Sequence, residues 1–413
     1  MNRVHIFVHQ PMRIIHRHAT LLAAISIYSI LCVALAFGID GSITSINSDF
    51  GFYNNAVVTA LEGWVSPLAQ NLYEQSPYVD PLYRQGWLAT PFYSYLFLAP
   101  IWLLGSQLIF GLLGWGIGIL TLIGFYCLIR AKLEQLPWSY EFALMCILPL
   151  NFNFLVDSVG VSTMSVAAMF VILAFVVKHR FLRMLLFSCA AMTRSNYLIA
   201  LACAFVVLVM LRPKGWRELL VDFTPSVIVT MIFYVSFYST YPGSGLNYIF
   251  STVYQGLDYA QPMGVELVRS RLGIESEESL FSSQMSIQDF FHMLTFAQTW
   301  SYIFNVWALK VSVTLGLIHE KLFESDYEFW LAKAWRTSYF VAISLPGIYA
   351  AVIVFISRHV NLRERSIYLW IFLYLGLNSL LIGDPRYLMG SCFFLALGLV
   401  RLLSLLQLSF RSS

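Results

Sequence analysis

Four segments of the sequence place charged residues directly beside long apolar runs, where side chains could act at a membrane surface. Asp49 follows the first run, Asp157 follows the third, Arg194 lies between the fifth and sixth, and Asp384 with Arg386 lies between the ninth and tenth. A charged side chain within a membrane helix costs about 3 kcal/mol on insertion scales, so such groups usually have a function. Carboxylates take protons from hydroxyl groups, and guanidinium groups bind phosphate through paired hydrogen bonds. The four segments therefore predict proton and phosphate chemistry.

The two isolated carboxylates also have structural interpretations. Asp49 could be a general base, or it could be the N-cap of a helix that begins at Phe50, because Asp is a favoured cap. Asp157 could contact an acceptor or a metal, or it could cap the helix that follows it. Asn151 and Asn153 lie nearby, but no His or Cys accompanies them, so a transition-metal site is not favoured.

The arginines have alternatives of the same kind. Arg386 could bind a phosphate or diphosphate, or it could pair with Asp384 across the rigid Pro385. Arg194 has the same two interpretations, and it could also anchor the chain by reaching lipid headgroups. These alternatives stay open at the level of the sequence.

The composition places the chain in a broad class. The protein has 413 residues, of which 59% are hydrophobic and only 11% are charged, whereas soluble proteins carry about 25% charged residues. This balance predicts an all-α polytopic membrane protein and excludes a nucleic-acid-binding footprint. The six Cys lie in apolar runs with no CxxC pair, so neither a disulfide framework nor a zinc site is expected.

Hydropathy and the placement of Lys and Arg predict about ten transmembrane helices in one membrane domain, residues 1–413, with both termini in the cytoplasm. Residues 89–104 are interpreted as a helix on the outer surface, because counting them as a span would put the later basic clusters outside. Two long outer segments result, 39–106 with surface helices and 242–336. The predicted spans are 20–38, 107–129, 139–155, 159–177, 182–193, 196–211, 221–240, 337–357, 366–382 and 388–408.

Several short motifs resemble the GT-C superfamily of membrane glycosyltransferases, in particular the type of protein O-mannosyltransferases and aminoarabinose transferases. The motifs are Asp49-x-x-x-Tyr53-x-x-Ala56, Thr90-Pro91-Phe92-Tyr93-Ser94-Tyr95-Leu96, Asp157 after the third span, Met192-Thr193-Arg194, and Arg386-Tyr387 late in the chain. Their order covers most of the sequence. The chain has neither the Trp-Trp-Asp-Tyr-Gly block of oligosaccharyltransferases nor a second Asp beside Asp157, which favours a monosaccharide donor and a glycan or lipid acceptor.

The resemblance implies a glycosyltransferase that moves a sugar from a polyprenyl-phosphate donor to a glycan, lipid or protein acceptor. Asp49 would be the catalytic base, Asp157 an acceptor-binding or secondary carboxylate, and Arg386, Arg194 and Tyr387 would bind the phosphate. No cofactor is implied, and a divalent metal is not favoured. The resemblance also implies a multi-pass protein of the bacterial inner membrane, with a site that faces the periplasm or exterior and builds an envelope glycan.

Two other functions stay open. A polysaccharide polymerase of the O-antigen type would use several outer Arg residues and would not need the first-loop Asp49. A transporter or flippase of polyprenyl-linked lipids would call for inverted repeats or for charged residues at the middle of the membrane. The sequence shows neither feature, and its charges instead gather at the outer ends of predicted spans.

Overall fold

A computed structural model describes the residues 19–34, 107–132, 136–159, 161–193, 197–211, 337–381 and 389–412, together with isolated positions within 217–231, 297–308 and 334–335. All regular structure in these residues is helical. The helices are Ala19–Ala34, α8 (Gln107–Lys132), α9 (Trp138–Ile147), η2 (Leu148–Leu150), α10 (Phe152–Val159), α11 (Thr163–Val176), α12 (Arg180–Thr193), α13 (Tyr197–Leu211), η3 (Phe340–Ser344), α20 (Leu345–Ile356), α21 (Leu362–Leu381) and α22 (Met389–Ser412).

Two helices in this part of the chain are long and apolar enough to cross a membrane, Gly111–Ala131 and Thr337–Ile356. A third candidate is the pair Trp138–Leu150 and Phe152–Val159, which passes the same test together but bends by 59° at its break. The all-α class is thus confirmed for the described residues. The two long outer segments, 39–106 and 242–336, fall almost wholly outside them.

The first helix and α8 run in opposite directions. Trp138, just after α8, donates an indole hydrogen bond to Thr20 at 3.0 Å, and Trp115 near the start of α8 donates to Ser29 at 2.9 Å. Parallel packing relates α8 and α11, because Gly114 of α8 lies against Ser158 just before α11, and later residues of both helices also meet. The ends of α8 and α11 therefore lie at the same end of the bundle.

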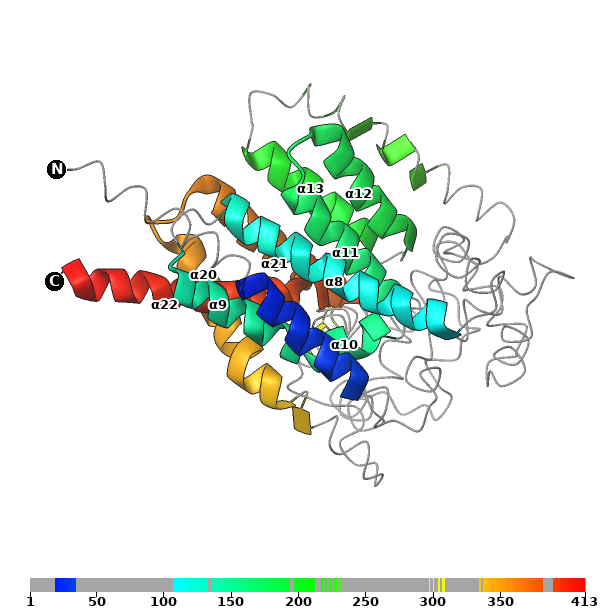
Figure 1. Cartoon of the computed structure of the whole chain (residues 1–413). Helices are drawn as coiled ribbons and strands as arrows, with labels where there is room; N and C mark the ends of the chain where they lie inside the picture. The colour runs from blue at the N-terminus through cyan, green and yellow to red at the C-terminus, as the bar shows by residue number, and fades with distance from the viewer. Residues whose placement is uncertain are drawn as a thin grey trace, which may run out of the picture.

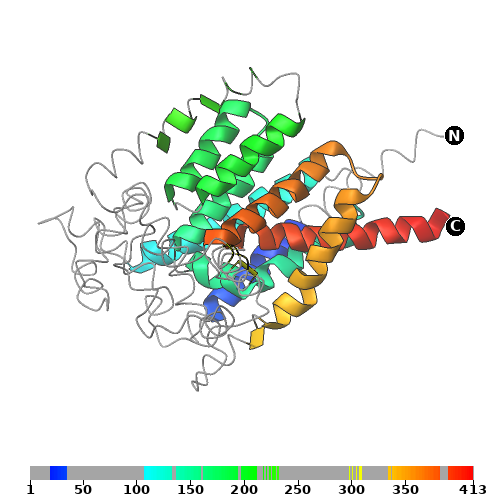
Figure 2. The ribbon, with the colours of Figure 1, turned by 180° about the vertical axis from the view of Figure 1, so that it is seen from behind.

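The last three helices, α20, α21 and α22, run in alternating directions. An ion pair of 3.0 Å between Arg401 and Glu364 joins the start of α21 to the later part of α22, so these helices are antiparallel. The rings of Tyr197 and Tyr374, 5.7 Å apart, join the start of α13 to the later part of α21. Gly347 of α20 packs on the N-terminal half of α22, and the two helices run parallel. The result is a bundle in which described helices that follow one another in sequence, such as α20, α21 and α22, run in alternating directions, whereas α8 packs parallel to α11 and α20 packs parallel to α22 (Figures 1 and 2).

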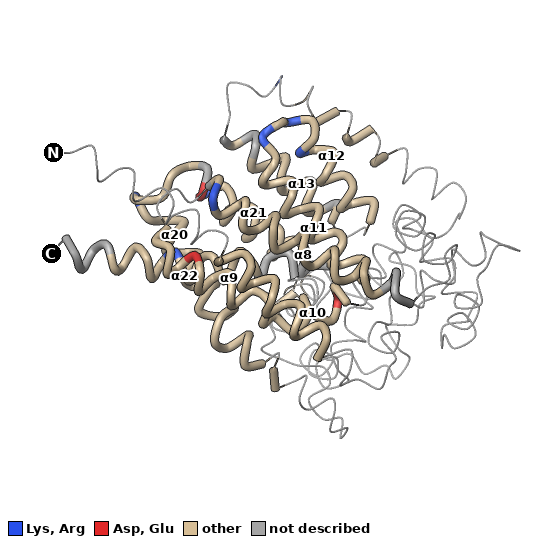
Figure 3. The backbone as a smooth tube through the Cα atoms, viewed as in Figure 1, with Lys and Arg blue, Asp and Glu red and all other residues tan. Residues whose placement is uncertain are grey.

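The described Lys and Arg residues gather at one end of this bundle, while the middles of the helices are largely without charge (Figure 3). We call this the basic end and define it by Lys178, Arg180, Arg358 and Arg365. The opposite end, where α10 lies, is called the Asp157 end. The first helix, α9, α12 and α21 begin at the basic end, whereas α8, α11, α13, α20 and α22 finish there.

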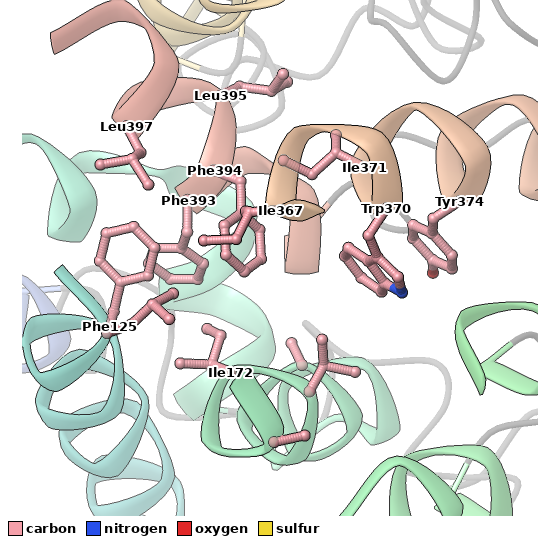
Figure 4. Close-up of a cluster of buried hydrophobic side chains, with 14 of the residues drawn as sticks. Phe125, Ile172, Ile367, Trp370, Ile371, Tyr374, Phe393, Phe394, Leu395 and Leu397 are labelled. Carbon is pink, nitrogen blue, oxygen red and sulfur yellow. The ribbon is translucent and has the colours of Figure 1, made fainter. Parts of the chain in front are cut away.

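Aromatic side chains fill the core where α21 and α22 meet α8 and α11. Trp370 stacks on Tyr374 with ring centroids 5.1 Å apart, and its indole nitrogen donates to the Ala200 carbonyl of α13 at 3.0 Å. Phe393 of α22 lies beside Phe125 of α8, and Phe394 lies between Phe125 and Trp370 (Figure 4). These rings are buried, and aromatic pairs stabilise a core by about 1 kcal/mol beyond the area they bury. The aromatic core fixes the helices whose ends form the Asp157 end.

Candidate functional site

The Asp157 end is built around a break in what was predicted to be one straight span, 139–155. The helix stops at η2, whose Pro149 lacks an N–H and clashes with the preceding turn, and the chain bends by 59° before α10. The Leu150 carbonyl at this break accepts a hydrogen bond of 2.8 Å from the Trp335 indole. Backbone N–H and C=O groups outside regular helix are tolerated at membrane depth only where protein or water supplies a hydrogen-bond partner. The Trp335 indole is that partner here.

Asn151 restarts the helix after the break. Its side-chain oxygen accepts a hydrogen bond of 3.0 Å from the Phe154 backbone N–H, as an N-cap residue does. Its own carbonyl accepts from Leu155 N at 3.1 Å, the first bond of the new helix. The short α10 therefore begins where the residue order Pro-Leu-Asn allows a new helix to start.

Asp157 lies within α10 and is only 3% exposed. It is followed by Ser158, which is fully buried. The Asp157 backbone carbonyl accepts two hydrogen bonds, from Ser162 N at 2.8 Å and from Ser165 Oγ at 3.0 Å. The residue therefore sits beside the N-terminus of α11, whose dipole favours a nearby negative charge.

The turn between α10 and α11 is tight and strained. Val161 has a φ of 49°, a conformation that β-branched residues rarely adopt, and its N–H bonds the Ser158 carbonyl at 3.0 Å. Ser162 then caps α11 by accepting from Met164 N at 3.1 Å. Strained backbone of this kind costs about 1–3 kcal/mol and is found most often at functional sites.

Tight packing against α8 holds α10 in place. A Cβ atom at Gly114 would lie 2.5 Å from the Ser158 carbonyl oxygen and 2.7 Å from that of Val159, so only glycine permits this approach. From the first helix, the buried Tyr28 hydroxyl donates to the Gly114 carbonyl at 3.4 Å, and its ring lies 5.4 Å from that of Phe154. Two helices therefore determine where the Asp157 segment lies.

The structure corrects one interpretation of Asp157 and leaves its chemical role as a prediction. The N-cap residue of the following helix is Ser162, and Asp157 lies inside a separate short helix rather than beyond the end of a span. A buried carboxyl beside hydroxyl groups can hold or accept a proton from a bound hydroxyl. Within the described residues, no group of three or more His, Cys, Asp or Glu side chains is arranged to hold a metal ion.

The other predicted site residues, Asp49, Arg194, Arg386 and Tyr387, lie outside the described residues, as does Asp384. Three described helices lead toward them in sequence. The Ala19–Ala34 helix precedes Asp49, α12 ends one residue before Arg194, and α21 ends five residues before Arg386. All three helices run from the basic end to the Asp157 end.

Sequence analysis missed the polar network at the basic end. Arg130 pairs with Glu141 at 3.1 Å and Arg401 pairs with Glu364 at 3.0 Å, and both carboxylates are at most 3% exposed. Each pair joins two helices, so only the packing reveals it. The one sequence feature that could have indicated a pair was the position of Arg401 inside an apolar run, because charged residues in such runs are usually paired.

No protein-family model matches this chain, and neither a curated protein nor a solved structure shows significant similarity to it. The resemblance to the GT-C superfamily therefore stays a prediction that depends on the short motifs alone.

Replacing Gly114 by Ala tests the packing that holds α10. The added methyl would overlap two backbone carbonyls that cannot rotate away, so we expect a destabilisation of about 1–3 kcal/mol, typical of overpacking. Thermal unfolding of the full chain in detergent measures it. Gly116→Ala, on the same helix with no atom near the new methyl, is the matched control. Equal melting temperatures for the two variants would contradict the described contact.

Proposed function

We propose that this protein is a membrane glycosyltransferase with about ten transmembrane helices, which moves a sugar from a polyprenyl-phosphate donor to a glycan, lipid or protein acceptor on the non-cytoplasmic face. Asp49 is the general base, Asp157 contacts the acceptor as a second carboxylate, and Arg386, Arg194 and Tyr387 bind the phosphate. The basic end faces the cytoplasm and the Asp157 end faces outward, in the bacterial inner membrane.

Exposed apolar side chains support a membrane location. On α20, Tyr349 and Ile356 are both 69% exposed, and Ile353 between them is 52% exposed. Their spacing puts them along one face of the helix. An apolar stripe of this kind would be a liability in water, whereas hydrocarbon covers it at no cost.

The observation that carries the proposal is the common direction of the helices that lead toward the predicted site residues. The first helix, α12 and α21 all run to the end that holds Asp157. The same end carries the break at Pro149 and the strained turn at Val161. The Lys and Arg gather at the opposite end, as the positive-inside rule requires of cytoplasmic ends.

The number of residues in each link determines how strongly the helix directions constrain the position proposed for its site residue. Arg194 belongs to a three-residue link between α12 and α13, and Arg386 belongs to a seven-residue link, 382–388, between α21 and α22. An extended chain reaches at most about 3.5 Å per residue, so the shorter link constrains the proposed position of Arg194 more than the longer one constrains that of Arg386. Asp49 comes 15 residues after Ala34, which is too long a segment to fix its position.

The proposed reaction needs these groups and no general acid. Asp49 takes the proton from the acceptor hydroxyl while that oxygen attacks the anomeric carbon of the donor sugar. The bond from this carbon to the phosphate oxygen breaks, and polyprenyl phosphate leaves with the electron pair. Arg386 and Arg194 offset the charge that develops on the phosphate, and such fixed charges are effective because they need no reorganisation. Inversion at the anomeric carbon follows from the single displacement.

One observation favours the transporter alternative. Discontinuous helices are common at the substrate sites of secondary transporters, and α9–η2–α10 is a discontinuous helix. A transporter would move the polyprenyl-linked sugar intact, whereas a transferase separates the sugar from the lipid. Chromatography of the lipid after incubation in vesicles distinguishes the two functions.

Asp49→Asn tests the proposed base. The amide cannot take a proton, so we expect transfer from a polyprenyl-phosphate sugar to fall by about 10²–10⁴-fold, the range of general-base contributions. The measurement is the loss of sugar from a panel of such donors, with melting temperature as the check on folding. Glu277→Gln, another carboxylate neutralised in a predicted outer segment, should keep its activity. Wild-type turnover in Asp49→Asn would contradict the proposal.

Asp157→Asn separates a binding role from a structural one. If the carboxylate contacts the acceptor, the variant keeps the wild-type melting temperature while the KM for acceptor rises and the KM for donor stays constant. If Asp157 only stabilises α10, the melting temperature falls and both KM values stay unchanged in the remaining folded protein. Steady-state kinetics with each substrate varied in turn measures the difference.

A further inference from the structure

A second buried polar cluster lies at the basic end, and the proposed reaction does not use it. Arg401 of α22 meets Glu364 of α21 through two contacts, Nε to Oε1 at 3.0 Å and Nη2 to Oε2 at 3.5 Å. The side chains are 7% and 1% exposed, respectively. Asn361 supports the pair by capping α21, since its side-chain oxygen accepts from Glu364 N at 2.8 Å. The guanidinium and carboxylate are therefore held in a fork-to-fork geometry away from solvent.

Three polar atoms around this ion pair are buried without a hydrogen-bond partner among the described residues. They are the remaining guanidinium nitrogen Nη1 of Arg401, the Tyr368 hydroxyl and the Ser404 hydroxyl. Tyr368 and Ser404 are fully buried, and Tyr368 lies within electrostatic reach of both Glu364 and Arg401. Over 90% of buried polar groups in proteins are paired with protein or with ordered water, so this cluster calls for a ligand.

Helical geometry brings these atoms to the same place. Tyr368 lies four residues after Glu364 on α21, and Ser404 lies three residues after Arg401 on α22, so each pair shares a helix face. Side chains on a helix lean toward its N-terminus, which turns the Tyr368 ring back toward the carboxylate and Ser404 back toward the guanidinium. The ion pair joins the two faces, so the unpaired groups surround it.

We propose that Glu364, Tyr368, Arg401 and Ser404 form a buried site for an ordered water molecule. The two charges cancel, so an anion would be repelled by Glu364 and a cation by Arg401, which leaves a neutral ligand. Water accepts a hydrogen bond from Nη1 and either donates to or accepts from the two hydroxyls. Buried waters typically make about three hydrogen bonds to otherwise unsatisfied groups, and this site offers that number.

The water would serve the contact between α21 and α22. Burying two charges removes their hydration, and an incomplete hydrogen-bond shell makes that cost larger. A bridging water restores bonds nearly as favourable as direct ones. The water site thus joins α21 to α22 at the end opposite the link 382–388. It does not depend on the proposed glycosyl transfer.

Radiolytic footprinting tests this site directly, because X-ray pulses generate hydroxyl radicals from bound water that oxidise adjacent buried side chains. Tyr368 is the reporter, and Trp370, equally buried but with its indole N–H bonded to the Ala200 carbonyl, is the internal control. Trypsin cleaves after Arg365 and after Arg386, so both residues lie in one peptide, 366–386. Fragment-ion mass spectra then compare the oxidation of the two side chains within that peptide. In the full-length protein in detergent, Tyr368 is oxidised several-fold faster than Trp370.

The double variant Glu364→Met/Arg401→Met supplies the matched comparison. Two apolar side chains of similar length replace the charges, and such replacements of buried ion pairs are often tolerated. Oxidation of Tyr368 then falls to the rate of Trp370. A Tyr368 rate equal to that of Trp370 in the wild-type protein would show a dry site and overturn the proposal, and this comparison decides even if the variant does not fold. Fast oxidation of Tyr368 that persists in the folded double variant would also overturn it.

Discussion

Charged side chains are costly to place among apolar helices, and this constraint organises the described part of the molecule. Its Lys and Arg gather at one end of the bundle, and the two ion pairs given by Arg130 with Glu141 and by Arg401 with Glu364 belong to that end. Between the two ends the helices meet through aromatic rings and close glycine contacts rather than through charges. The alternation of helix directions follows, because each apolar helix can finish only where the chain finds polar surroundings.

The Asp157 end departs from regular helix in ways that the basic end does not. Pro149 interrupts one helix, Asn151 restarts it, and Val161 takes up a strained conformation before the next helix. A π-helical turn, η3, also begins soon after Trp335, which bonds the same break. Irregular turns of this kind persist only where the surrounding structure holds them, and they are frequent at functional sites. These features favour a surface site at this end over a path along the bundle axis.

For the described part of the chain, sequence alone predicted the helices well and their irregularities poorly. The ends of α8, α11 and α13 could be predicted because Lys132, Lys178 and Arg212 follow long apolar runs. The bend at Pro149 was missed because the apolar pattern continues across it. Hydropathy does not show that the proline lacks a backbone N–H. Whether Asp157 or Ser162 would cap the next helix could not be decided from residue type, since both are good N-cap residues.

The candidate site was predictable only in part. Charged residues next to apolar segments led to Asp157, which the structure buries within α10, and its role stays a prediction. The pairing of Glu364 with Arg401 could not be predicted, because it depends on which helices are neighbours, and nothing in either local sequence specifies that. The same limit applies to Gly114, whose importance comes from two carbonyl groups more than forty positions away.

The central claim is that the links carrying Asp49, Arg194 and Arg386 open on one face of the membrane, opposite to the basic end. Single-cysteine accessibility in intact cells tests it most directly, in a chain whose six native Cys are replaced. Ser48→Cys, Ser195→Cys and Leu388→Cys should react with a membrane-impermeant maleimide from outside. His179→Cys and His359→Cys, exposed at the basic end, should react only after the membrane is permeabilised. Labelling of Ser195→Cys and Leu388→Cys from different sides, or together with His179→Cys, would contradict the account.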